Sequence, residues 1–128
     1  MKTIIVFDRY HNMLEAFERF LSAENYRVLT VETLDEVAMI MDVIKVDIVI
    51  VDVDKSPEFS VLEGLRQMKK KNMNLPIILT ATYSDTMTEN IVKELDAAAL
   101  ILKPFDPGVM KRTVRELVEK KNMCSSPS

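Results

Sequence analysis

The sequence predicts a doubly wound α/β domain, in which a parallel sheet carries helices on both faces. The first observation is alternation, because five short apolar runs are separated by longer segments whose apolar residues recur at helical spacing. The second is size, because 128 residues with 48% hydrophobic side chains can form one core and are too few for two ordinary domains. We therefore expect one domain over residues 1–121 and a flexible polar tail over residues 122–128.

The five apolar runs have the length of strands. They cover residues 3–7, 26–31, 47–51, 76–81 and 98–102. The second run is the most mixed in polarity, which is typical of an edge strand, whereas strands buried on both faces are almost continuously apolar. The first, third and fourth runs are therefore expected at the centre of the sheet.

Between the runs, apolar residues repeat every three or four positions, so each segment predicts a helix with one face on the sheet. The stripes are Leu14, Phe17 and Leu21; Leu34, Val37, Ala38 and Met41; Leu62, Leu65 and Met68; Met87, Ile91 and Leu95; and Met110, Val114 and Leu117.

Several helix starts carry a capping signal. Three pairs have capping-box spacing, in which each side chain satisfies a free backbone donor. The pairs are Thr33 with Glu36, Ser60 with Glu63, and Thr86 with Glu89. In the last helix Asp106 is the expected cap and Pro107 the first helical residue, and the helix should end near Lys121.

Composition excludes several functional classes. The net charge is −3, so no basic surplus favours direct binding to nucleic acid. The first apolar run is five residues long and stops at Asp8, which is too short for a signal peptide or a membrane span. The single cysteine, Cys124, has no partner for an internal disulfide. We expect a soluble cytoplasmic protein with no membrane contact.

Polar side chains follow four of the predicted strands. Asp8 follows the first run, Asp52 the third, and Lys103 the fifth, while the fourth ends at Thr80, Ala81 and Thr82. The carboxyl ends of parallel strands meet at one edge of the sheet, where ligand chemistry gathers. This set suits phosphoryl transfer to a carboxylate: a nucleophile, a second acid for a divalent cation, a hydroxyl and an ammonium group.

With these residues the chain resembles a response regulator receiver domain, from Ile4 to about Lys121. The strand "DIVIVD" resembles the family's acceptor strand and "LILKPF" its lysine strand. The resemblance implies a flavodoxin-like five-stranded sheet in the order 2-1-3-4-5 and a role in two-component phosphorelay signalling rather than an enzyme activity. It also implies that Asp52 is the phosphoacceptor, that Lys103 is the family's lysine, and that Asp8 and Asp52 bind Mg²⁺.

The sequence departs from the family pattern at this edge. Arg9 replaces the second acid of the first strand, which predicts weak Mg²⁺ binding if the guanidinium lies beside Asp8. Alternatively Arg9 turns outward and Asp54 supplies extra negative charge. Counting back from Lys103 puts Ala81, rather than Thr80, at the position of the family's switch hydroxyl.

Three further departures concern loops and the last strand. Lys55 and Ser56 replace the usual Met-Pro pair after the acceptor, and Leu100 replaces a common aromatic residue. Asp96 stands where a glycine commonly precedes the fifth strand, and an aspartate tolerates the left-handed conformation better than most residues.

Two alternatives to the phosphorylated receiver remain. One is a degenerate receiver that binds partners without phosphate. The other is a haloacid dehalogenase-like phosphatase, suggested by "IVIVDVDKS", although that family needs further acids late in the chain. The lone His11 receives no role.

Expected partners are a sensor histidine kinase or phosphotransfer protein, and an output protein or second copy at a face that includes Lys93, Leu100, Lys111 and Arg115. The sequence does not identify the kinase, the output or a downstream effector domain.

Overall fold

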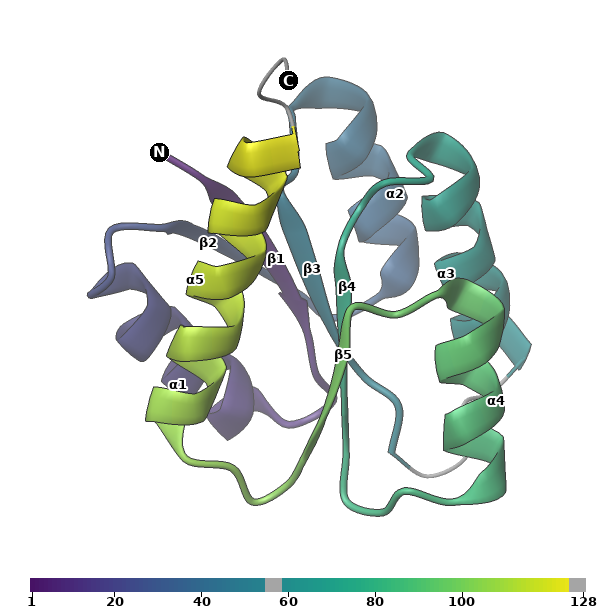
Figure 1. Ribbon diagram of the computed structural model, residues 1–128. Helices are drawn as coiled ribbons and strands as arrows, with labels where there is room; N and C mark the ends of the chain where they lie inside the picture. Colours follow the sequence, from purple (N-terminus) through teal and green to yellow (C-terminus); the bar gives the residue numbers. More distant parts are fainter. Residues whose placement is uncertain (55–58, 125–128) are drawn as a thin grey trace.

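Strands and helices alternate along the chain, as predicted (Figure 1). The structure is a computed structural model that describes residues 1–54 and 59–124, with the backbone alone at 59–61 and 121–124. The strands are β1 (Thr3–Phe7), β2 (Arg27–Val31), β3 (Ile48–Asp52), β4 (Ile77–Ala81) and β5 (Ala99–Leu102). The helices are α1 (His11–Ser22), α2 (Leu34–Val43), α3 (Phe59–Lys71), α4 (Thr86–Leu95) and α5 (Pro107–Cys124).

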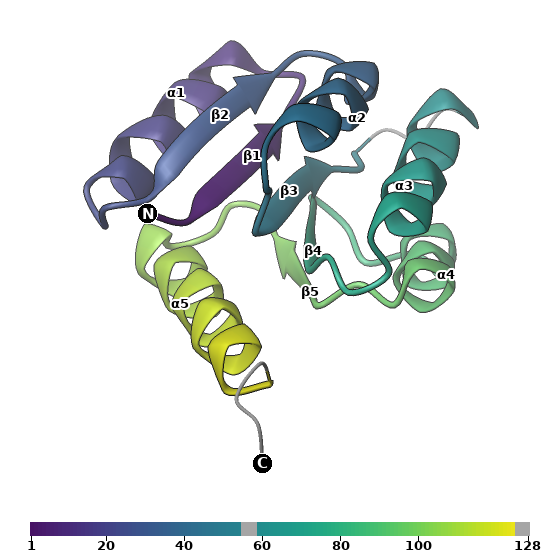
Figure 2. The same ribbon diagram turned by 90° about the horizontal axis from the view of Figure 1, so that it is seen from above.

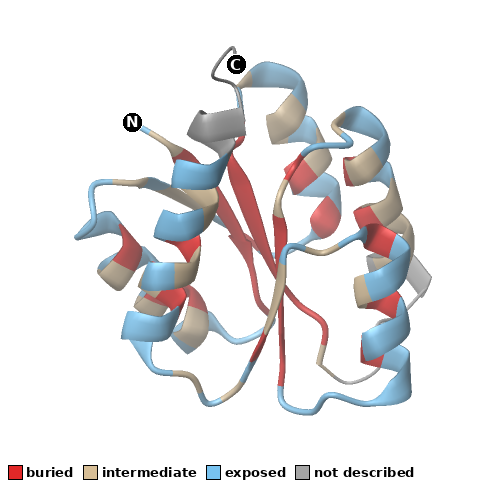
Figure 3. Cartoon of the chain, viewed as in Figure 1, coloured by how far each residue is buried: buried red, intermediate tan, exposed pale blue. Residues whose placement is uncertain are grey.

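The strands form one parallel sheet in the order β2-β1-β3-β4-β5, which confirms the predicted fold class and topology. Every residue of β1, β3 and β4 is buried, because these three strands have neighbours on both sides and helices on both faces (Figure 3). The mixed strand β2 lies at an edge, as its composition predicts.

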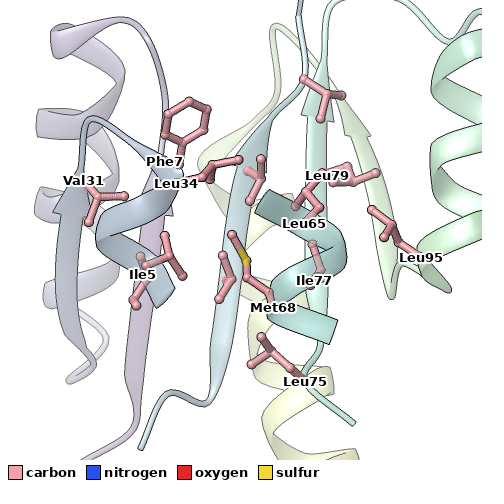
Figure 4. Close-up of a cluster of buried hydrophobic side chains, with 14 of the residues drawn as sticks. Ile5, Phe7, Val31, Leu34, Leu65, Met68, Leu75, Ile77, Leu79 and Leu95 are labelled. Carbon is pink, nitrogen blue, oxygen red and sulfur yellow. The ribbon is translucent and has the colours of Figure 1, made fainter. Parts of the chain in front are cut away.

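Helices α1 and α5 cover one face of the sheet, and α2, α3 and α4 cover the other (Figure 2). Each face has its own apolar cluster. The cluster under α2, α3 and α4 contains Leu34, Leu65 and Leu95 from the predicted stripes (Figure 4). The cluster under α1 and α5 contains Phe17 and Met110. The described helix stripes therefore face the sheet, with one exception in α4.

The exception arises from the start of α4. The prediction of Thr86 as the cap is wrong: Asp85 is the N-cap, and its carboxylate accepts a hydrogen bond from the Thr88 N–H at 2.8 Å. A charged carboxylate suits the positive end of the helix dipole. Met87 is 49% exposed, and Thr88 rather than Met87 is buried.

The other helix ends agree more closely with the sequence. Thr33 accepts from the Glu36 N–H at 3.4 Å, and Asp106 accepts from the Gly108 N–H at 2.7 Å. Asp96 has φ 50°, so the expected left-handed residue before β5 is confirmed. Helix α5 continues to Cys124, three residues beyond its predicted end, and the Ser60 cap lies outside the described side chains.

Candidate functional site: a buried acid pocket

The candidate site lies where β1, β3 and β5 end at the same edge of the sheet. Side chains alternate between the two faces of a strand, so Asp8 follows Val6, Asp52 follows Ile50, and Lys103 follows Ile101 toward the α1 and α5 face. The structure brings the three predicted residues together. The Lys103 ammonium lies 2.9 Å from Asp8 Oδ2 and 3.3 Å from Asp52 Oδ1.

Both acids are almost completely buried, with 2% of Asp8 and 1% of Asp52 exposed. Burial raises the pKa of Asp52, and the negative charge of Asp8 adds to this effect, while the Asp54 N–H and Lys103 oppose it. For Lys103, burial lowers the pKa, but the hydrogen bond to Asp8 and the charge of Asp52 outweigh burial and raise it. Lys103 is therefore a firmly charged cation inside the pocket.

The pocket contains unused hydrogen-bonding capacity. Asp52 Oδ1 accepts from the Asp54 N–H at 3.0 Å, and Asp8 Oδ1 accepts from the Tyr10 N–H at 2.9 Å. In contrast, Asp52 Oδ2 and Thr80 Oγ1 are buried without a hydrogen-bond partner among the described residues. Native proteins pair most such atoms, so an unpaired carboxylate oxygen here is a candidate for contact with a ligand or for nucleophilic attack.

Thr80, Ala81 and Thr82 lie at the end of β4 or just beyond it, and each has different contacts. Thr80 is the β4 partner of Asp52 in the strand register. Ala81 belongs to the apolar cluster on the opposite face. The sequence analysis missed the role of Thr82, whose backbone N–H and hydroxyl both donate to the Asp54 carboxylate, the hydroxyl at 2.9 Å. Asp54 stands two positions after Asp52, and Thr82 stands two positions after Thr80. Because Asp52 and Thr80 are neighbours in the sheet, this equal spacing could have predicted the contact between Asp54 and Thr82.

The side chain of Arg9 does not complete the pocket. It is exposed, and the described residues include no ion pair between it and Asp8 or Asp52 within 4.0 Å. Of the two directions that the sequence left open for Arg9, the one beside Asp8 is therefore not adopted. Lys103 neutralises the acids instead, and Asp54 Oδ2 lies 3.7 Å from Lys103 Nζ, which matches the alternative in which Arg9 turns outward. Asp8 turns inward at the strand end, so the next residue points the other way.

The described acids do not form a closed metal cage. No group of three or more acidic, histidine or cysteine side chains is arranged to hold a metal ion in residues 1–54 and 62–120. However, Mg²⁺ keeps several waters and is usually held by only one or two carboxylates. Asp8 and Asp52, with the unpaired Oδ2 of Asp52, fit such a hydrated ion.

Other residues of interest lie away from this pocket. Lys93 and Arg115 are exposed, Leu100 packs partly against the cluster under α4, and Lys111 lies 3.9 Å from Glu24. His11 is the exposed first residue of α1. The departures at Lys55 and Ser56 fall outside the described residues. None of the helices in the described part of the chain has the length and apolar character needed to cross a membrane.

The fold is an α/β domain of flavodoxin-like topology, and two buried acids and a lysine meet at the carboxyl edge of its sheet. The chain belongs to the response regulator receiver domain family of two-component signalling, whose pattern it matches over residues 4–115. The match is to this family rather than to the phosphatase family considered above.

Solved structures share the fold of this chain. The receiver domain structure from Clostridium thermocellum has a TM-score of 0.83 with 21% identity, over 97% of this chain and 99% of that one. TrrA of Thermotoga maritima, solved with Mg²⁺ and beryllofluoride, has a TM-score of 0.77 with 29% identity, over 91% and 99%.

Two curated relatives are longer proteins. The hydrogenase transcriptional regulatory protein HoxA of Cupriavidus necator is 28% identical over 94% of this chain and 25% of its own length. PhoP of Bacillus subtilis, an alkaline phosphatase synthesis regulator, is 21% identical over 99% and 52%. The chain thus spans about a quarter to a half of these relatives.

Proposed function

We propose that this domain receives a phosphoryl group on Asp52 and passes the resulting change to a partner. The observation that carries the proposal is the unpaired, buried Oδ2 of Asp52 beside a lysine that holds the other oxygen at 3.3 Å. Oδ2 attacks the phosphorus of the donor, the bond from phosphorus to the donor breaks, and the donor leaves with the bonding electrons. An acyl phosphate forms on Asp52, and Lys103 offsets the added negative charge.

Mg²⁺ binding is proposed to be weak. Asp8 and Asp52 would hold the ion, and it would neutralise charge on the phosphoryl oxygens. Arg9 occupies the position of the family's second acid and cannot act as a ligand, so one expected contact is missing. Because Arg9 is exposed, its effect is limited to a lost ligand, and its guanidinium does not compete for Asp8.

The proposed phosphoryl donor is a sensor histidine kinase or phosphotransfer protein, and the proposed location of the domain is the cytoplasm. The proposed role is signalling rather than metabolic catalysis. The proposed output surface, for a partner protein or a second copy, comprises Lys93, Leu100, Lys111 and Arg115. The proposed domain limits are residues 1–121, with residues 122–128 as a tail.

The test is to titrate the purified chain with Mg²⁺ and an acyl phosphate donor and to measure covalent labelling by intact mass. We expect slow labelling of the wild type, no labelling of Asp52→Asn, and faster labelling with tighter Mg²⁺ binding for Arg9→Asp. Arg19→Asp is a matched control, because it makes the same charge change on an exposed part of α1. Labelling that persists in Asp52→Asn would exclude Asp52 as the acceptor.

A second candidate is a binding module that works without phosphate. One observation favours it: Lys103 already contacts Asp8, Asp52 and Asp54 at 2.9, 3.3 and 3.7 Å, so the pocket is partly neutralised by its own side chain. An absence of labelling in both the wild type and Arg9→Asp, together with unchanged partner binding by Asp52→Asn, would favour this candidate.

A further inference from the structure

Asp54 is joined to the start of the segment before α4 by two hydrogen bonds. Its Oδ1 accepts from the Thr82 N–H, and its Oδ2 accepts from the Thr82 hydroxyl at 2.9 Å. The two residues are 28 positions apart in the chain. They connect the segment that follows β3 with the segment that leads from β4 into α4, and we refer to this pair as the Asp54–Thr82 latch.

The latch is in direct contact with the acid pocket. Asp54 donates its backbone N–H to Asp52 Oδ1 at 3.0 Å, and its carboxylate lies 3.7 Å from Lys103 Nζ. Asp52 and Asp54 therefore compete for one cation while they share a hydrogen bond. A change of charge on Asp52 must alter the balance that keeps the Asp54 side chain against Thr82.

The neighbouring β4 residues offer no other polar link to the acids among the described contacts. Ala81 has no hydroxyl and packs on the opposite face, and the Thr80 hydroxyl has no partner within the described part of the chain. Thr82 is the hydroxyl at this strand end that contacts a pocket acid. A signal from Asp52 to α4 can therefore pass through Asp54 and Thr82.

We propose that the Asp54–Thr82 latch holds the segment before α4 while Asp52 is unmodified, and that additional negative charge on Asp52 opens it. Phosphorylation adds about one further negative charge beside the Asp54 carboxylate, and like charges repel. Asp54 then loses its hold on Thr82, and the segment containing Tyr83, 75% exposed, becomes free to rearrange. The phosphoryl arm of this proposal rests on the function proposed for Asp52.

Hydrogen exchange at the Thr82 amide, followed by NMR, tests the latch directly. Asp54→Ala should speed this exchange by about tenfold or more, because the amide loses a charged acceptor. Substitutions at residues 52 and 54 do not alter the neighbours of Thr82 in sequence, so its unprotected exchange rate stays constant. Asp106→Ala is the matched control: it removes a similar bond from the Gly108 N–H and should leave Thr82 unchanged.

The charge on Asp52 is then varied in both directions. Asp52→Asn should slow Thr82 exchange severalfold, and acyl phosphate labelling should speed it toward the rate of Asp54→Ala. Equal Thr82 exchange in wild type and Asp54→Ala would overturn the latch. Labelling of Asp52 with unchanged Thr82 exchange would overturn its opening by charge, although Asp52 would remain the acceptor. Slower exchange in Asp52→Asn without any labelling would support the charge-sensitive latch and refute the proposed phosphoryl function.

Discussion

Strand β3 has a buried aspartate at each end, and the two differ in what they contact. Asp47, just before the strand, is 4% exposed, and Asp52, its last residue, is 1% exposed. Asp47 Oδ2 accepts from the Thr3 N–H at 2.8 Å, which ties β3 to the start of β1. Asp52 shares the buried ammonium of Lys103 with Asp8. Asp47 lies 4.0 Å from the more exposed ammonium groups of Lys2 and Lys45. Burial alone therefore does not mark a functional acid; a buried cation held between two buried acids does.

The comparison is tested most strongly by removing Lys103 at the Asp52 end and Lys45, one of two lysines that lie 4.0 Å from Asp47, at the other end. Lys103→Met leaves two buried carboxylates without their ammonium partner and should lower the free energy of unfolding by about 3 kcal/mol at pH 7. Urea unfolding measures the loss. The loss should shrink as acid neutralises the carboxylates. Because the pKa of Lys103 is raised in the folded state, its contribution is present at neutral pH and disappears only as alkali titrates the lysine.

The control is Lys45→Met at the Asp47 end, where the ammonium lies 4.0 Å from Asp47 and the side chain is 75% exposed. Exposed ion pairs contribute little, so the change should stay within about 0.5 kcal/mol. Equal losses for the two lysine variants would remove the electrostatic distinction between the ends of β3.

A second prediction concerns the structural acid. Asp47→Ala leaves the buried Thr3 N–H without its acceptor and should cost about 2 kcal/mol in unfolding free energy. Asp47→Asn keeps an oxygen at that place and should recover part of the loss. Urea unfolding gives the energies, and faster hydrogen exchange at the Thr3 amide would locate the effect. Full stability in Asp47→Ala would mean that Asp47 does not tie β1 to β3.

The third and smallest prediction is a gain in stability, whereas the first two are losses. Asp52→Asn should raise the free energy of unfolding at pH 7 by about 1 kcal/mol, because it removes a buried charge that folding disfavours. The pKa of Asp52 is raised in the folded state, so wild-type stability falls as pH rises through that folded value. The gain should therefore vanish below the unfolded pKa. Urea titrations at several pH values measure it, and destabilisation at pH 7 would put Asp52 in the same class as Asp47.

The parts of the molecule in which apolar residues repeat at regular spacing were predicted from the sequence. Alternation along strands placed Asp8, Asp52 and Lys103 at one edge, and helical spacing identified the faces that cover the sheet. The direction of Arg9 was left open, because a residue just beyond a strand can follow either the strand alternation or the loop. The contact between Asp54 and Thr82 depends on two irregular segments, which no periodic pattern describes. The cap of α4 differed by one residue because two adjacent polar residues competed for the position.

The bond between Lys103 and Asp8 joins residues 95 positions apart, and this has a consequence for the order of folding. Strands β1 and β3 can pair and bring Asp8 and Asp52 together before β5 adds its lysine, so an early compact state contains two acids and no ammonium partner. We expect the pocket to form late, after the main folding barrier, since distant contacts carry the greatest loop-closure cost. Lys103→Met should then accelerate unfolding and leave the refolding rate nearly unchanged, which stopped-flow chevron plots would measure. The site where the signal is received would be the last part of the sheet to assemble and the first to open.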